Sequence, residues 1–294
     1  MTATSGLALS AMGSSAAQES DLFTIVSYNV LNGFTKGKTL DKGIAWIREQ
    51  NADVLALQEL VGITGLQLAQ LAKQWDHPYA AILKEGGYPV GITSKTPIRV
   101  VDRVLKGMHH GFLWVETAGI DFFVVHLSPH KYKHRRREAD IICDRVEKQL
   151  KAGKHVVALG DFNAVSPLDL DYLASMETLR QQLTENDEKN PNVENLVEGR
   201  FDFKPIQRFL NTGLRDACWE IGQASPMPNG SYPSRILAPD DTDQQHAEKL
   251  RRIDYVMMDP GLTKRMVEAE IVRDGGVDEI SDHYPVVVRI DRSK

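Results

Sequence analysis

The stretch LFTIVSYNV, residues 22–30, has the pattern of a buried β-strand that ends in polar groups. It is largely apolar and β-branched, which is typical of a strand with both faces covered. The stretch ADVLALQEL, residues 52–60, repeats this pattern. The first stretch closes near Asn29 and the second near Glu59, so each expected strand carries a polar side chain at its end.

A helix is expected between these two strands. Residues 39–50 place Leu40, Ile44 and Ile47 at the spacing of one helical face. The order of strand, helix and strand predicts an α/β fold.

Further stretches have the length and apolar content of strands, with Gly, Pro and Asp between them. They are residues 79–83, 88–95, 97–105, 111–117, 120–127, 155–162, 252–258 and 284–290. Helices are expected at residues 64–75 and from near Glu138 to residue 152. About ten strands with several helices most simply form two mixed sheets packed face to face, with helices outside. Residues 181–200 are polar and lack periodicity, which predicts a surface loop.

Length and composition are those of a soluble globular protein. The 294 residues are 42% hydrophobic and 26% charged, enough for one large domain or two small ones. The net charge of −5 gives no whole-molecule sign of nucleic-acid binding, so an anionic partner must be bound by local charge. Two cysteines, Cys143 and Cys218, are too few for a disulfide scaffold or a thiolate zinc site. Whether the two cysteines form one disulfide bond with each other is left open by the sequence.

The first twenty residues, MTATSGLALSAMGSSAAQES, are small, apolar or hydroxylated and contain no lysine or arginine. They are too short and too weakly apolar for a membrane span. The apolar stretch followed by small residues resembles the end of a secretory signal, although the basic segment that starts such signals is missing. A signal-peptide remnant and a disordered tail both fit residues 1–22. A secreted or periplasmic location is favoured slightly over a cytoplasmic one.

Polar residues suited to metal or phosphate chemistry stand at the ends of several expected strands. They are Asn29, Glu59, His126, Asp161, Asn163, Asp254, Asp282 and His283. Each alone fits ordinary turn chemistry. Strands of two facing sheets bring their ends to a common rim, however, and several carboxylates and amides there suit a cation or a phosphate. Oxygen ligands without a cysteine cluster favour magnesium or manganese over zinc.

Hydrolysis of a phosphate ester needs a divalent cation, a base for water and a proton source for the leaving oxygen. The sequence contains no P-loop, no HExxH zinc motif and no GxSxG nucleophile elbow. Nucleotide-driven motors, zinc proteases and serine hydrolases therefore have no support.

The ordered motifs SYNV, LQE, VVHL, GDFN, RIDYV and SDHYPV resemble those of the endonuclease/exonuclease/phosphatase superfamily. Its members include deoxyribonucleases, abasic-site endonucleases, neutral sphingomyelinases and inositol polyphosphate phosphatases. The resemblance covers residues 23–290. It implies a four-layer α/β sandwich, a single catalytic domain over residues 23–294 and a metal-dependent hydrolase of phosphoric esters.

The resemblance also implies a metal site. Glu59 is similar to the principal Mg²⁺ ligand of the family, with Asn29 beside it and Asp282 completing the cation environment. Mn²⁺ is the alternative ion. Asn29 is also expected to contact the substrate.

Catalytic roles are carried over in the same way. Asp161 resembles the residue that orients or deprotonates the attacking water, and Asn163 the residue that holds this water and the phosphate. His283 resembles the histidine on the scissile phosphate. Asp254 resembles the carboxylate that fixes the tautomer of that histidine, which should raise its pKa.

His126 separates branches of the family. Members similar to deoxyribonucleases and sphingomyelinases carry histidine there and abasic-site endonucleases carry tyrosine, so His126 disfavours DNA repair and is expected to be catalytic. The run HKYKHRRR, residues 130–137, fits either a solvated turn or a phosphate-binding rim that uses Arg135 and Arg136.

Long nucleic acid usually calls for a wider basic face than this run supplies. We therefore expect a phosphodiesterase that acts as a monomer on a small or short phosphate ester. A DNA or RNA nuclease of the same superfamily is the alternative. A sphingomyelinase or phosphatase, or a binding module without catalysis, also stays open.

Overall fold

The structure, a computed structural model, describes residues 21–222 and 230–294. The expectations of a signal remnant or a tail for residues 1–20 lie outside these residues. No helix within the described ranges has the length and apolar character needed to cross a membrane.

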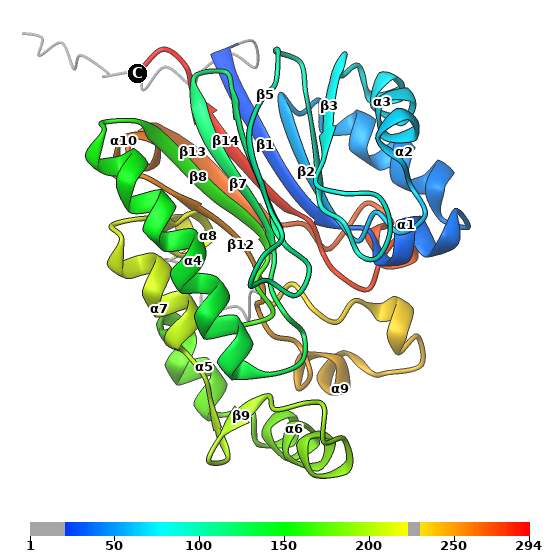
Figure 1. Ribbon diagram of the computed structural model, residues 1–294. Coiled ribbons are helices and arrows are strands. Elements are labelled where there is room, and N and C mark those ends of the chain that lie inside the picture. Colours follow the sequence, from blue (N-terminus) through cyan, green and yellow to red (C-terminus); the bar gives the residue numbers. More distant parts are fainter. Residues whose placement is uncertain (1–20, 223–229) are drawn as a thin grey trace, which may run out of the picture.

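Two six-stranded sheets form the centre of the molecule (Figure 1). The first contains, in spatial order, β13 (Met266–Ile271), β14 (Val286–Asp291), β1 (Leu22–Asn29), β2 (Val54–Gln58), β4 (Gly91–Ser94) and β3 (Tyr79–Ile82). The second contains β11 (Arg215–Asp216), β12 (Asp254–Met258), β8 (His155–Asp161), β7 (Ile120–His126), β6 (Phe112–Thr117) and β5 (Arg99–Val104). Both sheets are mixed, because β1 runs parallel to β2 and β7 parallel to β8 while the other pairs are antiparallel.

Helices cover the outer faces of both sheets (Figure 1). The first sheet is covered by α2 (Leu40–Glu49) and α3 (Gly65–Ala72), and the second by α4 (Tyr132–Lys151) and α7 (Lys204–Asn211). The remaining helices are α1 (Leu31–Lys36), α5 (Leu170–Ala174), α6 (Glu177–Lys189), α8 (Ala217–Gly222), α9 (Asp243–Ala247) and α10 (Pro260–Thr263). The predicted four-layer α/β sandwich is confirmed.

The two faces of each central strand are both buried. In β1, Ile25 packs between the sheets, whereas the next residue, Val26, packs outward against Trp46 and Ile47 of α2. Full burial of one such aliphatic side chain stabilises the fold by about 1.5–3 kcal/mol. Burial on both faces explains why the strand sequences are almost continuously apolar.

Helix α4 begins at Tyr132, not near Glu138 as the sequence suggested. The basic run therefore forms the first turns of this helix, and the expectation that the run precedes the helix was wrong. Glu138 is buried, and its carboxylate accepts hydrogen bonds from the backbone N–H groups of Ser128 (2.8 Å) and His109 (2.5 Å). These contacts to distant segments extend the helix through a stretch whose local charge opposes it.

Residues 181–200 are not the surface loop that their polarity indicated. Most of α6 (Glu177–Lys189) lies there, followed by the short hairpin of β9 (Leu196–Val197) and β10 (Arg200–Phe201). Exposed ion pairs three and four residues apart, such as Glu185 with Lys189, support this polar helix, and Leu179 anchors it in a small cluster.

The two cysteines are separate, buried free thiols, so the open question of a bridge is settled against pairing. Cys143 packs between α4 and the second sheet, and Cys218 packs between the sheets. Burial raises the pKa of both thiols, that of Cys218 to about 12. Both therefore act as small apolar residues.

Candidate active site

The polar strand ends meet at one edge of the sandwich. The parallel pair of β1 and β2 ends beside Asn29 and Glu59, and the parallel pair of β7 and β8 ends with His126 opposite Asp161. The carboxyl ends of parallel strands share an edge of their sheet, where ligands bind in α/β proteins. Asn29 links the two sheets, because its Nδ2 lies 3.2 Å from Oδ2 of Asp161.

Two side chains of this edge stand on backbone in the left-handed region. Glu59 has a φ of 60° and Asn163 a φ of 46°. Non-glycine residues seldom adopt such angles, which concentrate at functional sites. The backbone N–H of Gly33 donates a 2.7 Å hydrogen bond to the carbonyl of Glu59 and holds this turn in place.

Gly160 precedes Asp161 and has a φ of 137°. A Cβ atom at this position would lie 2.0 Å from the backbone oxygen of Val125 in the neighbouring strand. Only glycine fits there, so β7 and β8 approach closely just before the strand delivers Asp161.

Asp254 and His283 form a buried pair. Nδ1 of His283 lies 2.8 Å from Oδ2 of Asp254, which also accepts a 2.7 Å hydrogen bond from Oγ of Ser231. Burial by itself lowers the pKa of His283. The charge of Asp254, its hydrogen bond, and the nearby carboxylates of Asp161 and Asp282 outweigh burial and raise this pKa to about 10. His283 is therefore an imidazolium at neutral pH.

Nε2 of His283 faces the centre of the site, 3.9 Å from Oδ2 of Asp161 and 3.5 Å from Nδ2 of Asn29. Burial and the charge of Asp254 raise the pKa of Asp161 to about 8, although His283 and the N–H of Asn163 oppose the shift. A carboxylate of this pKa is a competent base at mildly alkaline pH, where it is ionised. Asn163 fixes its orientation through the backbone N–H at 2.8 Å and Nδ2 at 3.2 Å.

The donor set fits a hard cation. One donor atom each from Asp161, Asp254 and His283 lies within 4.8 Å of the others, so this buried cluster could hold a metal ion once His283 has lost its proton. Oδ1 of Asp254 is buried and has no hydrogen-bond partner among the described residues. Glu59 lies next to the cluster, with Oε1 3.3 Å from Nδ2 of Asn29. Buried carboxylates with an unsatisfied oxygen are stabilised by a cation.

Asp282 is less closely joined to this cluster than the sequence suggested. Its carboxylate accepts a long hydrogen bond of 3.4 Å from Oγ of Ser281, and burial raises its pKa while His283 opposes the shift. Its hydrogen bonds within the described part of the chain do not include Glu59 or Asn29.

His126 faces the same centre, with Nε2 3.5 Å from Oδ2 of Asp161. Its ring stacks on His110 at 4.1 Å, and His109 and His130 continue the row with ring centroids 4.3 Å and 4.8 Å apart. Burial lowers the pKa of His126 and of His110, the latter to about 3. This row was not predicted from the sequence; the pair of adjacent histidines before a strand is the signal that could have indicated it.

The three arginines of the basic run have different environments. Arg136 makes a two-pronged ion pair with Asp202, at 2.8 Å for the shortest contact, and Arg137 is exposed. Arg135 is buried and lines a cavity together with Asn163. Arg251, on the opposite side of this cavity, was also missed because it stands beside the motif RIDYV and not within it.

The sandwich and its polar edge are those of a known family of phosphoric-ester hydrolases. The sequence profile of the Endonuclease/Exonuclease/phosphatase family matches residues 26–283, so the chain belongs to this family, which is metal-dependent. No curated protein matched the chain in sequence.

Solved structures show the same fold. An AP endonuclease from Archaeoglobus fulgidus is similar with a TM-score of 0.68 and 18% identity, covering 92% of this chain and 99% of that one. A 3′ phosphatase from Neisseria bound to a product DNA hairpin has a TM-score of 0.65 and 16% identity, with 92% and 99% covered. A 3′-5′ exonuclease from Neisseria meningitidis has a TM-score of 0.64 and 16% identity, with 92% and 100% covered.

Proposed function

We propose that the protein is a Mg²⁺-dependent phosphodiesterase that acts on a small or short substrate. The convergence of Asp161, Asp254 and His283 at the strand ends, with Asn29 and Glu59 beside them, carries this proposal. Attack of water on a phosphate requires a base for the water and a positive charge for the phosphate oxygens. Asp161 and the imidazolium of His283 lie close enough together to supply both.

Glu59, Asn29 and Asp282 would hold the ion through oxygen atoms, the donors that Mg²⁺ prefers. When bound, Mg²⁺ neutralises negative charge on the phosphate and on the leaving oxygen. Mn²⁺ is the second choice, because the same oxygen donors accept it.

The remaining steps belong to side chains of the protein. Asp161, with its raised pKa, takes the proton of the attacking water, and Asn163 orients the water and one phosphate oxygen. His283 donates from Nε2 to a non-bridging oxygen, since Nδ1 is held by Asp254. The bond from phosphorus to the leaving oxygen breaks as the bond to water forms, and the leaving oxygen then takes a proton from solvent. His126 lines the same volume beside Asp161.

A small substrate is favoured by the distribution of charge. The net charge is −5, and Arg136 is already neutralised by Asp202. In the described part of the chain, the basic run therefore has fewer free charges than its sequence suggests, whereas long nucleic acid usually needs a wide basic face. A nuclease is the second candidate, because one similar structure is bound to a DNA hairpin and another is named an exonuclease.

The test compares hydrolysis of bis-p-nitrophenyl phosphate and p-nitrophenyl phosphate by the purified protein while Mg²⁺ is titrated after treatment with EDTA. We expect Mg²⁺-dependent release of nitrophenol, faster from the diester, and its loss in D161N, which keeps the shape of the side chain. Faster hydrolysis of the monoester would replace the phosphodiesterase by a phosphatase. Inactivity on both esters with Mg²⁺ and with Mn²⁺ would reject the proposed function.

A further inference from the structure

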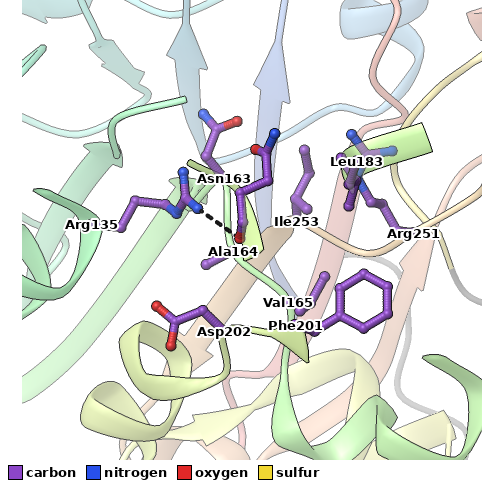
Figure 2. Close-up of a pocket in the computed structure, with 10 residues that line it drawn as sticks. Arg135, Asn163, Ala164, Val165, Leu183, Phe201, Asp202, Arg251 and Ile253 are labelled. Atoms are coloured by element: carbon purple, nitrogen blue, oxygen red, sulfur yellow. Dashed lines mark hydrogen bonds between the residues drawn. The ribbon is translucent and has the colours of Figure 1, made fainter. Parts of the chain in front are cut away.

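A small cavity adjoins the catalytic residues at Asn163. Figure 2 shows Arg135 and Arg251 on opposite sides of it, with Asn163 and Ile253 between them. Its volume is about 60 Å³. One water needs about 10–15 Å³ measured in this way, so the cavity has room for a group of several heavy atoms.

Arg135 forms one wall of the cavity and is 3% exposed. Its hydrogen bonds go to backbone carbonyls, at 3.2 Å to Ser128 and at 3.5 Å to Glu194 and Asn195. No carboxylate lies within ion-pair distance of this guanidinium in the described part of the chain. A buried charge without a counter-ion is costly, so this side chain would be stabilised by an anion.

Arg251 forms the opposite wall. Its guanidinium carbon lies 4.7 Å from the centre of the Tyr232 ring. Among residues 21–222 and 230–294, its side chain has no ion pair and no hydrogen bond. Its donors are therefore free to bind a ligand that enters the cavity.

Asp202 is the acidic residue of the lining, and it does not cancel the two arginines. Both of its carboxylate oxygens accept hydrogen bonds from Arg136, at 2.8–3.2 Å, and Oδ1 also accepts from the backbone N–H of Lys204. In the described part of the chain, Arg135 and Arg251 therefore face the cavity without a direct ion-pair partner, although Asp202 and Asp161 act on Arg135, and Asp161 on Arg251, at longer range.

Asn163 belongs to both the cavity and the catalytic centre, and the ring of Tyr232 lies between Arg251 and His283. Tyr232 lies 4.8 Å from the centre of the His283 ring, and Arg251 packs on Tyr232 as well. The guanidinium carbon of Arg251 is therefore no farther from the His283 ring than the sum of these two distances. One sugar with a phosphate at each end can bridge such a span.

We propose that Arg135 and Arg251 form a second phosphate subsite, which binds a non-scissile phosphate of the substrate. The inference rests on the proposed function for the scissile phosphate and specifies the substrate class: a phosphate ester that carries another phosphate one sugar away. Paired guanidinium groups suit this ligand because each can donate two hydrogen bonds to phosphate oxygens.

Binding tests the subsite without requiring turnover. Calorimetry with D161N in Mg²⁺ compares thymidine 3′,5′-bisphosphate with thymidine 5′-monophosphate. We expect the bisphosphate to bind about 10–100-fold more tightly, the size of charge-assisted hydrogen bonds. Adding R251Q or R135Q should remove most of this advantage and leave affinity for the monophosphate within about two-fold. R137Q, which changes an exposed arginine of the same helix, is the matched control and should keep the advantage.

Equal affinity of D161N for the two ligands would overturn the proposed subsite. Tighter binding of the bisphosphate that persists in R251Q would also overturn it. Arg251 is partly exposed, so R251Q decides the question even where R135Q fails to fold. The two proposals can fail separately. Inactivity on the p-nitrophenyl esters would reject the proposed hydrolase. Tighter binding of the bisphosphate than of the monophosphate, lost in R251Q, would still establish the subsite.

The same measurement identifies the source of the phosphate. The dinucleotide pTpT carries its second phosphate as an internal diester, whereas the bisphosphate carries it as a terminal monoester. If D161N binds pTpT more tightly than thymidine 5′-monophosphate, and R251Q removes this difference in affinity, the subsite binds a nucleic-acid strand. If only the bisphosphate binds more tightly than the monophosphate, the subsite binds a small molecule.

Discussion

Oδ2 of Asp254 accepts hydrogen bonds from both Nδ1 of His283, at 2.8 Å, and Oγ of Ser231, at 2.7 Å. One carboxylate oxygen thus fixes the rotation of the imidazole and is itself fixed by a buried hydroxyl. The other nitrogen of the imidazole, Nε2, is left facing Asp161. Asp254 and His283 are expected to act as a unit, with Asp254 positioning the ring and holding its charge.

The first prediction is a double-mutant cycle on this pair. H283A should lower kcat/KM by about 10²–10⁴-fold, the range for loss of a general acid–base group. D254N should cost much of the same factor, because it removes the charge that keeps His283 protonated. The double variant should be little worse than H283A, since residues that act as a unit are non-additive. Losses that simply multiply in steady-state kinetics would show that the two side chains act separately.

The second prediction concerns the metal. E59Q should keep the fold, because Gln can still accept the 2.9 Å hydrogen bond that the backbone N–H of Asn32 donates to Glu59. Removal of the charge should weaken Mg²⁺ binding and lower turnover by about 10²-fold or more. A Mg²⁺ titration of activity and of heat release measures both effects. Full activity of E59Q at low Mg²⁺ would exclude Glu59 as the principal ligand.

The third prediction concerns Gly160. G160A should destabilise the protein by about 2–4 kcal/mol, because its Cβ collides with a neighbouring strand and not with a flexible side chain. G119A is the matched control. Gly119 also has a positive φ, of 76°, but a Cβ there would meet nothing within 4 Å, so only the backbone cost of about 1–2 kcal/mol applies. Urea unfolding gives both values, and equal losses would show that the close approach of β7 and β8 is unimportant.

The fourth prediction is a dependence of stability on pH. Burial lowers the pKa of His110 in the folded state to about 3, with the charges of His109 and Lys84 adding to the effect. The unfolded state then binds the proton more readily, so stability falls as pH drops below about 6.5 and continues to fall toward the folded pKa. H110F keeps a ring stacked on His126 and removes this titration.

Between pH 7 and pH 5, the free energy of unfolding should fall by up to about 2 kcal/mol more in the wild type than in H110F. This follows from a slope of about 1.4 kcal/mol per pH unit below pH 6.5. Denaturant midpoints in EDTA at several pH values provide the measurement. H134F, a change at an exposed histidine, should follow the wild type. Parallel pH profiles for wild type and H110F would contradict the prediction.

The sheets and the polar strand ends could be predicted from the sequence because short local stretches of residues determine both. A strand buried on two faces is apolar throughout, as at Ile25 and Val26, and the polar residues that close such strands stand out. The start of α4 could not be predicted in this way. Arg135 there is bonded to carbonyls at Glu194 and Asn195, which lie 59 and 60 positions later in the chain, and no local signal reports such contacts.

The last strand, β14, has a consequence for synthesis. It pairs with β1 on one side and β13 on the other, and His283 lies just before it. Until residues 280–291 have been made, β1 has an open edge, and Asn29 has no contact with His283, 254 positions later. A growing chain therefore carries Glu59 and Asp161 without Asp282 and His283, and it exposes an apolar strand edge that can pair with other chains. During translation, the risk of aggregation through the open edge of β1 thus comes before the catalytic edge is complete, because that edge needs residues 280–291.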